Sequence, residues 1–172
     1  MTMINVVSVN FLGVSVDAVD FNYMIEKVDH WIRIKNGRSH HIACINAYCV
    51  TLALKNERLR NIYNSSDIAG ADGMPFVKWI RLFTKESCER YYAPDVILKL
   101  AEHSKKTNYS FFLYGGDPIV LREMEEFLIN RFPYLRILGS YSPPFRDLTE
   151  IEDAKIVEMI NALKPDIIAV GL

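Results

Sequence analysis

The chain has 172 residues, of which 50% are hydrophobic and 24% are charged, as expected for a folded globular protein with a sizeable core. Its net charge of −1 excludes the simplest kind of nucleic-acid-binding protein, because such a protein needs a concentrated basic face. Three cysteines without metal-ligand spacing favour a reducing compartment, such as the cytoplasm, over a disulfide framework. We expect no signal peptide and no membrane-spanning segment, since no apolar run is long enough.

The first 92 residues are predicted to form a small β/α portion. Residues 4–9 and 11–16 are β-branched and apolar and predict two strands, with Gly13 as a bulge or bend. Asp20 is placed to cap a helix that begins at Phe21, and Gly37 is placed to end it. A strand over 41–45, helical sequence over 47–63 in one or two pieces, and a strand over 67–69 follow. The segment 76–83 has amphipathic helical spacing.

Residues 93–172 alternate regularly between strand and helix patterns. Helices are predicted over 94–106, 118–132 and 149–163, the last with a capping box of Thr149 and Glu152. Strands are predicted over 110–114, 135–138 and 167–172, and the last is expected to be buried on both faces because it lacks alternation. The predicted fold class is therefore α/β, a Rossmann-like, mainly parallel sheet flanked by helices, within one domain over 1–172.

Asp72 lies at a predicted strand-to-helix turn, between two glycines and in otherwise uncharged sequence. A carboxylate in an apolar crevice has a raised pKa, which suits a general base. The alternative is an N-cap, in which Asp72 accepts backbone N–H bonds from the helix that follows. From these residues alone, the N-cap is the more common outcome.

Two further turns could bind a nucleotide. Gly115 and Gly116 join a buried strand to a helix, where close backbone approach and free N–H groups favour a phosphate or diphosphate. A plain tight turn capped by Asp117 is the alternative, and that carboxylate disfavours a phosphate directly over the turn. The loop 139–145 has serines, an aromatic ring and two prolines that could hold a flat base, or it is a surface connection.

Other polar residues give weaker signals. Asn46 follows a strand and could donate to a diphosphate and accept from a sugar hydroxyl, or could cap the next helix. Arg90 could bind an anionic substrate or be a solvated charge. No pair of the four histidines has convincing ligand spacing, and there is no acidic pair for a divalent ion, so we expect no metal site.

The order and spacing of these segments resemble the WecG/TagA/CpsF glycosyltransferase family over residues 5–172, although each motif is weak by itself. The segments that carry the resemblance are Cys44-Ile-Asn46, Ala71-Asp-Gly-Met-Pro75, Arg90 with Asp95, Phe112-Leu-Tyr-Gly-Gly116, Gly139-Ser-Tyr-Ser-Pro-Pro-Phe145 and Pro165-Asp-Ile-Ile-Ala-Val-Gly171.

The resemblance implies an inverting transferase. It would move a sugar of the N-acetylmannosamine type from a UDP donor to an undecaprenyl-diphosphate-linked acceptor, without a metal cofactor. Such enzymes make teichoic acid linkage units, enterobacterial common antigen, capsules and exopolysaccharides. The implied location is the cytoplasm, peripheral at the inner face of the cell membrane, and a homo-oligomer is one open possibility.

The resemblance also implies roles for single residues. The family's proposed general base falls on Asp72, and its conserved asparagine falls on Asn46. The other residues implied in substrate binding are Cys44, Arg90, Gly115, Gly116, Gly139, Tyr141 and Gly171. Cys44 stands where the family usually has threonine, and its thiol is a weaker hydrogen-bond donor.

A second difference lies at the end of the chain. Family members continue beyond the segment that corresponds to Val170-Gly-Leu172 into a C-terminal appendage. We expect this chain to lack that appendage and therefore to be weakly active as a transferase. Two alternatives to the transferase stay open, a nucleotide-binding module that is catalytically incomplete and a Rossmann-type oxidoreductase. The second is disfavoured because no dinucleotide fingerprint is present.

Overall fold

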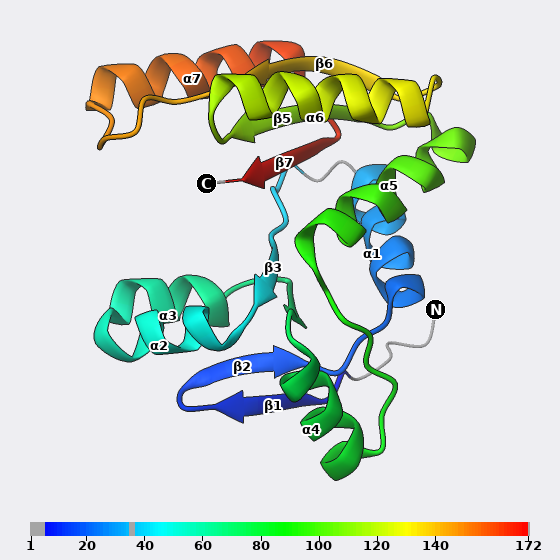
Figure 1. The fold of residues 1–172 in the computed structure, drawn as a ribbon, viewed down its shortest axis with the longest axis vertical. Coiled ribbons are helices and arrows are strands. Elements are labelled where there is room, and N and C mark those ends of the chain that lie inside the picture. The colour runs from blue at the N-terminus through cyan, green and yellow to red at the C-terminus, as the bar shows by residue number, and fades with distance from the viewer. Residues whose placement is uncertain (1–5, 35–36, 172) are drawn as a thin grey trace. The chain divides into compact units, whose positions relative to one another are not determined.

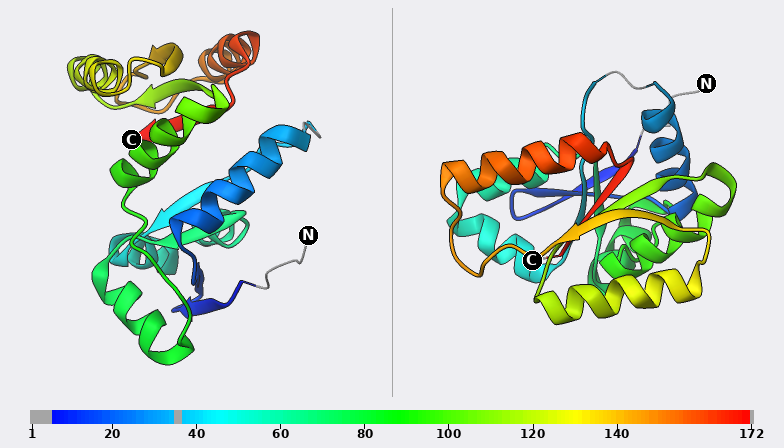
Figure 2. Two further views of the ribbon diagram at one scale, coloured as in Figure 1. Left: turned by 90° about the vertical axis from the view of Figure 1, so that its right-hand side faces the viewer. Right: turned by 90° about the horizontal axis from the view of Figure 1, so that it is seen from above.

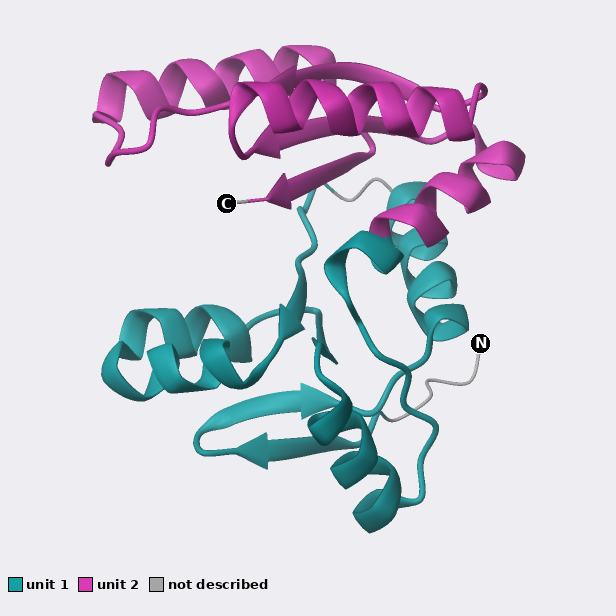
Figure 3. Cartoon of the chain, in the orientation of Figure 1, with its two compact units in different colours: residues 1–96 teal, residues 97–172 magenta. Residues whose placement is uncertain are grey.

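A computed structural model describes residues 6–34 and 37–171, and Figure 1 labels its elements. Strands β1 to β7 and helices α1 to α7 are interspersed along the described chain, which confirms the predicted α/β class. The chain divides into two compact units, residues 1–96 and residues 97–172, coloured teal and magenta in Figure 3. The boundary between them falls within helix α5 (Ala93–Thr107).

Unit 1, residues 1–96, contains a four-stranded sheet in the order β1-β2-β4-β3. Its strands are β1 (Ser8–Phe11), β2 (Val14–Asp17), β3 (Ile42–Ile45) and β4 (Ile68–Ala71). β1 and β2 pair antiparallel, whereas β4 pairs parallel with both β2 and β3. The carboxyl ends of β3 and β4 therefore lie side by side, because parallel neighbours end at the same edge of a sheet.

The N-terminal turn was predicted only in part: the expected bend at Gly13 lies in the turn, but the predicted break between the strands at Asn10 is wrong. Leu12 and Gly13 have positive φ angles of 53° and 94° and connect β1 to β2 as a tight hairpin turn. The predicted second strand over 11–16 runs through this turn, because apolar Leu12 hides it in the hydrophobic pattern. Residues 4–5 of the predicted first strand lie outside the described residues, and β1 begins at Ser8.

The helices of unit 1 largely follow their predicted caps. They are α1 (Phe21–Ile34), α2 (Ala47–Lys55), α3 (Glu57–Asn64) and α4 (Met74–Thr84). The Asp20 carboxylate accepts a hydrogen bond from the N–H of Tyr23 at 2.8 Å, which confirms the predicted N-cap. Asn56 caps α3 in the same way, which divides the helical sequence over 47–63 into two pieces.

The core of unit 1 lies between its sheet and its helices. Its fully buried side chains come from the strands, α2 and α4, and from Cys88 after α4. The members with the least exposure are Val14, Val16, Ile45, Ala53, Ala71, Val77, Ile80 and Cys88. This core fixes the ends of β3 and β4, where several predicted site residues follow.

Unit 2, residues 97–172, contains a parallel three-stranded sheet in the order β6-β5-β7. Its strands are β5 (Ser110–Gly115), β6 (Arg136–Tyr141) and β7 (Ile167–Gly171), and its connecting helices are α6 (Pro118–Arg131) and α7 (Glu150–Leu163). The right-hand view of Figure 2 shows α6 and α7 on opposite sides of these strands. This layering is typical of a Rossmann-like sheet.

Two strand predictions in unit 2 need correction. β6 continues to Tyr141, so Gly139 and Tyr141 belong to the strand and the loop begins at Ser142. β7 is an edge strand with Ile168 and Val170 exposed at 46% and 61%, so it is not buried on both faces. A continuous apolar run predicted burial on both sides, but only alternate residues of an edge strand are covered here.

Candidate active site

Asp72 directly follows the end of β4, and its backbone is tied to the neighbouring strand. Its N–H donates to the carbonyl of Ile45, the last residue of β3, at 2.7 Å. Helix α4 then begins at Met74, with Gly73 as its N-cap residue. The carboxylate is thus held at the carboxyl edge of the sheet, where ligands of parallel sheets usually bind.

The Asp72 side chain is not a helix cap. Gly73 occupies the N-cap position of α4, and no side chain makes a capping hydrogen bond there. The Asp72 side chain is only 15% exposed, and its buried Oδ1 has no hydrogen-bond partner. A buried polar atom without a partner costs free energy, so it is usually retained for a function such as catalysis or binding.

Arg90 is the charged neighbour of this carboxylate. Its Nε lies 3.4 Å from Asp72 Oδ1, which is close enough for an ion pair but does not have the geometry of a hydrogen bond. The guanidinium also lies over the Tyr92 ring, 4.6 Å from its centre. Its side chain is 45% exposed, so the cation could still meet an anionic ligand from solvent.

The segment around Arg90 is anchored on both sides by backbone hydrogen bonds. The N–H of Glu89 donates to the carbonyl of Val19 at 2.9 Å, and that of Tyr91 donates to the carbonyl of Ala71 at 2.8 Å. The Glu89 carboxylate also accepts from the N–H of Phe21 at 2.7 Å. These anchors hold Arg90 beside the turn that carries Asp72.

Tyr91 and Gly70 form a close contact that the sequence analysis missed. The Tyr91 ring is fully buried and rests on β4 at Gly70, where any Cβ would collide with the ring. The phenol donates to the carbonyl of Asp20 at 2.6 Å, and the ring stacks on Phe21 at 5.2 Å. The signal was available as a strand glycine, which often marks close approach of another group.

Cys44 lies on β3, opposite Gly70 in the strand register. Burial raises the pKa of its thiol to about 12, and the negative charge of Asp72 contributes, followed by Cys49. The thiol therefore stays protonated at neutral pH. It can donate a weak hydrogen bond, but it cannot act as a thiolate nucleophile.

Asn46 follows β3 and caps α2. Its Oδ1 accepts a hydrogen bond from the N–H of Cys49 at 3.0 Å, which confirms the capping alternative. Since the cap engages the oxygen, the Nδ2 amide group is the part of this side chain with donor capacity for a ligand. Cys44, Asn46, Asp72 and Arg90 thus form one group of predicted site residues in unit 1.

The remaining predicted residues form a second group in unit 2, at the carboxyl ends of its strands. Gly115 and Gly116 have positive φ angles of 111° and 72°. A Cβ on Gly115 would collide with the carbonyl oxygen of Gly171 on β7, so only glycine fits there. A Cβ added to Gly171 would have no other atom within 4 Å.

Gly139 and Tyr141 lie on β6. A Cβ on Gly139 would be 3.2 Å from the Phe112 ring, so this glycine has a packing role. The Tyr141 ring stacks on that of Tyr114, with centres 6.2 Å apart and planes at 19°. Just beyond β6, the Ser142 hydroxyl donates to the carbonyl of Gly116, which ties the loop to the glycine turn.

Asp117 caps helix α6, because its carboxylate accepts from the N–H of Ile119 at 2.8 Å. The capping alternative is therefore confirmed for this turn. The carboxylate places negative charge at the helix N-terminus, where it competes with a phosphate for the same N–H groups. The aromatic pair and the glycine backbone remain as the features of this group that suit a nucleotide.

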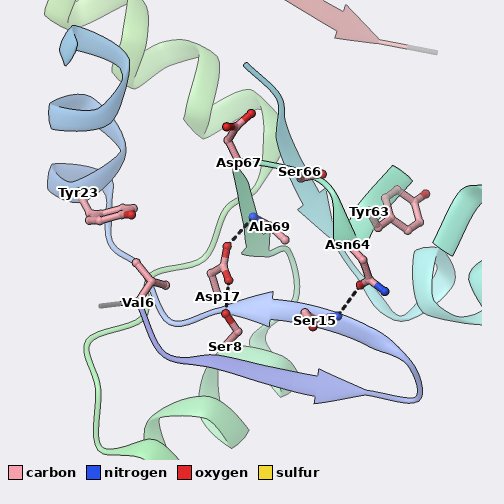
Figure 4. Close-up of a pocket in the computed structure, with 10 residues that line it drawn as sticks. All are labelled: Val6, Ser8, Ser15, Asp17, Tyr23, Tyr63, Asn64, Ser66, Asp67 and Ala69. Atoms are coloured by element: carbon pink, nitrogen blue, oxygen red, sulfur yellow. Dashed lines mark hydrogen bonds between the residues drawn. The ribbon is translucent and has the colours of Figure 1, made fainter. Parts of the chain in front are cut away.

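A polar pocket of about 320 Å³ lies elsewhere in unit 1 and is shown in Figure 4. None of the predicted site residues lines it. Its two carboxylates already have partners: Asp17 accepts from Ser8 at 2.6 Å and from the N–H of Ala69 at 2.8 Å, and Asp67 accepts from the N–H of His41 at 3.0 Å. These contacts join strands and loops, so the pocket is not the candidate active site.

The described residues contain neither a cluster of metal-ligating side chains nor a membrane-spanning helix. No group of three or more histidine, cysteine, aspartate or glutamate side chains within 6–34 and 37–171 could hold a metal ion. In the same ranges, no helix has the length and apolar character needed to cross a membrane.

Comparison with known proteins gives a match over nearly the whole chain. The profile of the family described as "Glycosyl transferase WecG/TagA/CpsF family" matches residues 9–172. Curated relatives from Staphylococcus aureus strains NCTC 8325 / PS 47, COL and MSSA476 are 21% identical over 168 residues. Each is named N-acetylglucosaminyldiphosphoundecaprenol N-acetyl-beta-D-mannosaminyltransferase. The match covers 98% of this chain and 64% of the length of these relatives.

Proposed function

The chain belongs to the WecG/TagA/CpsF family of glycosyl transferases, and from that premise we propose that it acts in cell-surface polysaccharide synthesis. The proposed reaction moves a sugar of the N-acetylmannosamine type from a UDP donor to an undecaprenyl-diphosphate-linked acceptor. The names of the curated relatives support this choice of sugar and acceptor. The observation that carries the proposal is the buried Asp72 carboxylate, whose Oδ1 has no hydrogen-bond partner.

We propose that Asp72 is the general base of the transfer. Its carboxylate takes the proton from the attacking hydroxyl of the acceptor sugar as the hydroxyl oxygen bonds to the anomeric carbon of the donor. The bond from that carbon to the UDP oxygen breaks at the same time, and UDP leaves with the bonding electrons. Attack from the face opposite UDP inverts the anomeric configuration, and a positioned base of this kind contributes about 10²–10⁴-fold to the rate.

Arg90 and Asn46 are proposed to bind the acceptor beside Asp72. The half-exposed guanidinium of Arg90 suits the acceptor's diphosphate, because its N–H fork matches anionic oxygens. Until the acceptor binds, the Asp72 carboxylate stays paired with Arg90, whose Nε lies 3.4 Å from Asp72 Oδ1. Asn46 donates from Nδ2, since its oxygen caps α2.

The second group of residues is proposed to bind the UDP donor. The Tyr141 ring offers a flat surface for uracil, and the turn at Gly115 and Gly116 offers backbone close to the diphosphate. Gly171 lies at the end of the adjacent strand and Gly139 supports β6 by close packing. We propose that backbone N–H groups stabilise the leaving diphosphate without a metal ion.

The acceptor chemistry also implies a location. A polyprenyl diphosphate is anchored in a bilayer by its lipid chain, so an enzyme that uses it must reach a membrane surface. We therefore propose that the protein works in the cytoplasm, peripherally at the inner face of the cell membrane.

One observation favours a second candidate function, a nucleotide-binding module without full catalytic power. Cys44 lies where the family usually has threonine, and its thiol is a poor hydrogen-bond donor that stays protonated. If a substrate hydrogen bond is weak there, nucleotide binding would survive while turnover falls. A measurement of sugar transfer by the full chain distinguishes this module from the transferase.

The test is sugar transfer to a lipid-linked N-acetylglucosamine acceptor by the full chain and by Asp72→Asn. We expect at least a roughly 100-fold loss of turnover with the fold intact, because the amide cannot accept the proton. The control is Asp147→Asn, which changes an exposed carboxylate outside both groups. Comparable turnover by Asp72→Asn and the parent would remove Asp72 from the mechanism, and absence of turnover in the parent would favour the binding module.

A further inference from the structure

Helix α4 carries several large exposed apolar side chains. Leu82 and Phe83 are 72% and 63% exposed, and Trp79 and Met74 are 44% and 45% exposed. We call these four residues the α4 surface. Large apolar groups gathered in this way mark a binding surface, whereas single exposed apolar residues are ordinary.

The α4 surface is held in a fixed shape by aromatic contacts. Phe11 of β1 stacks on Phe76 at 4.3 Å and meets the edge of Trp79 at 5.3 Å. Trp79 in turn lies 4.3 Å from Phe83. The core-facing side of α4 is a different one, because Val77 and Ile80 are buried there. The exposed rings are therefore additional to the core and are already ordered for contact with a partner.

The charged side chains on α4 itself are all positive. Lys78 is exposed and lies four residues before Leu82, so it shares that side of the helix, and exposed Lys85 follows the helix as its C-cap residue. Arg81 is exposed as well, although its Nε donates to the carbonyl of Cys88 at 2.7 Å. Residues 74–85 contain no aspartate or glutamate, and the exposed Glu86 follows directly after Lys85.

From these observations we propose that the α4 surface docks on an anionic lipid bilayer. Tryptophan and phenylalanine favour the boundary between head groups and acyl chains, and flanking lysines bind anionic head groups. The inference rests on the proposed function and deepens it, since it identifies the part of this chain that meets the membrane. Because α4 begins two residues after Asp72, docking would hold that carboxylate close to head-group level.

A second copy of the chain is a less suitable partner for the same surface. In a two-fold dimer through the α4 surface, each patch would face its own copy. Lys78, Arg81 and Lys85 would then meet the same cations of the other helix without any carboxylate on α4 to balance them. A bilayer with anionic head groups has the complementary charge.

The first measurement uses Trp79 as the reporter. The chain has two tryptophans, so the full chain with Trp31→Phe leaves Trp79 alone, and phenylalanine can keep the stacking on His40 seen at 4.3 Å. Vesicles of phosphatidylcholine with phosphatidylglycerol should shift Trp79 emission to shorter wavelength, and brominated lipids should quench it. Vesicles of phosphatidylcholine alone should do so much less, because the lysines then lack partners.

The second measurement is vesicle co-sedimentation of single variants. Leu82→Ser should weaken binding about tenfold, because it removes an apolar side chain from the lipid boundary. Ile151→Ser is the matched control, since Ile151 on α7 is 70% exposed and lies outside the α4 surface. Lys78→Gln and Lys85→Gln should each weaken binding about fivefold on the anionic vesicles.

Three results would overturn the docking proposal. These are equal vesicle binding by Leu82→Ser and Ile151→Ser, an unchanged Trp79 spectrum on anionic vesicles, and self-association that Leu82→Ser abolishes. Circular dichroism of each variant verifies that it is folded. No sugar substrate is present in these measurements, so failed docking leaves the assignment of Asp72 standing, and a failed transfer assay leaves docking standing.

Discussion

The two groups of candidate site residues differ in the kinds of chemical group that they present. In unit 1 the group consists of side chains with chemical function: a buried carboxylate on Asp72, a guanidinium on Arg90 and a thiol on Cys44. In unit 2 the group consists of backbone and rings: a glycine turn at 115–116 and the stacked pair of Tyr114 and Tyr141. This difference fits the roles proposed above, which are proton transfer and anion binding for the first group and nucleotide binding for the second.

The two groups also depend on glycine in different ways. In unit 1, Gly70 makes room for a side chain, the Tyr91 ring, whose backbone neighbour is Arg90. In unit 2, Gly115 makes room for backbone, the carbonyl of Gly171. A ring can shift slightly to relieve a clash, whereas a strand held in its ladder cannot, so the same substitution should have unequal effects.

The largest effect is expected for Gly115→Ala. The new Cβ would collide with β7 backbone, and alanine would have to adopt a φ of 111°. We expect a loss of about 4 kcal/mol in the free energy of unfolding, from overpacking and backbone strain together. Denaturant unfolding followed by far-UV circular dichroism measures it. Gly171→Ala is the control, because a Cβ there meets nothing within 4 Å, and equal losses would contradict this account.

A smaller loss, about 3 kcal/mol, is expected for Gly70→Ala, since the clash is with a buried ring that can move only a little. Both tryptophans, Trp31 and Trp79, lie in residues 1–96, so tryptophan fluorescence reports directly on this unit. Displacing Tyr91 should also displace Arg90. Turnover should therefore fall by more than the loss of folded protein explains. Unchanged stability would mean that the Tyr91 ring is not packed on β4 as described.

The pH dependence of stability should differ between two carboxylates. Burial alone would raise the pKa of Asp67, but hydrogen bonds from the His41 N–H and His40 and the charges of His40 and Arg38 lower it overall. A carboxyl whose pKa is lower in the folded state stabilises the fold above its unfolded pKa of about 4. That contribution is lost as the pH falls through the folded value.

Asp67→Asn should therefore flatten the acid side of the stability curve, measured as the unfolding midpoint between neutral pH and about pH 3. Glu152 is the comparison: the hydrogen bond from Arg146 and those from Thr149 lower its pKa to about 2, but this ion pair lies at the surface, with the Arg146 side chain 54% and the Glu152 side chain 38% exposed. Solvent screening should make the effect of Glu152→Gln much weaker. A larger effect from Glu152→Gln than from Asp67→Asn would contradict this ranking.

The smallest predicted effect tests how closely Asp72 and Cys44 interact. Burial first and then the charge of Asp72 raise the pKa of Cys44 to about 12, so iodoacetamide should alkylate it slowly at mildly alkaline pH. Asp72→Asn removes that charge and should speed alkylation several-fold, as followed by peptide mass spectrometry. Cys88 is the internal control, because Asp72 is not among the causes that raise its pKa. Equal acceleration at both cysteines would indicate general loosening.

Much of the fold could be predicted from local patterns. The capping box at Thr149, the cap at Asp20 and the alternation of helix and strand after residue 93 all appear in the structure, because they depend on nearby residues. The bend at Gly13 was expected, but the position of Leu12 in the turn and the exposure of β7 were predicted wrongly. Those depend on which strands pair and which faces are covered, which a hydrophobic run does not specify.

The candidate site was predictable in part. The sequence placed Asp72 and Asn46 each after a predicted strand, but it did not show that these strands are neighbours. The capping alternative is confirmed for Asn46, whereas the commoner expectation of a cap is wrong for Asp72. Gly70 signalled the close approach of another group, but the sequence could not identify that group as Tyr91, because no local pattern connects the two residues. Residues brought together by tertiary packing require a structure.

The central claim is that the group in unit 2 binds the nucleotide and the group in unit 1 performs the chemistry. Calorimetric titration of the full chain, Asp72→Asn and Tyr141→Ala with UDP tests it most directly. The account predicts that the parent and Asp72→Asn bind UDP equally well, while Tyr141→Ala loses at least about fivefold in affinity with the loss of ring stacking. Lost UDP binding in Asp72→Asn, unchanged binding in Tyr141→Ala, or no binding by the parent would contradict it.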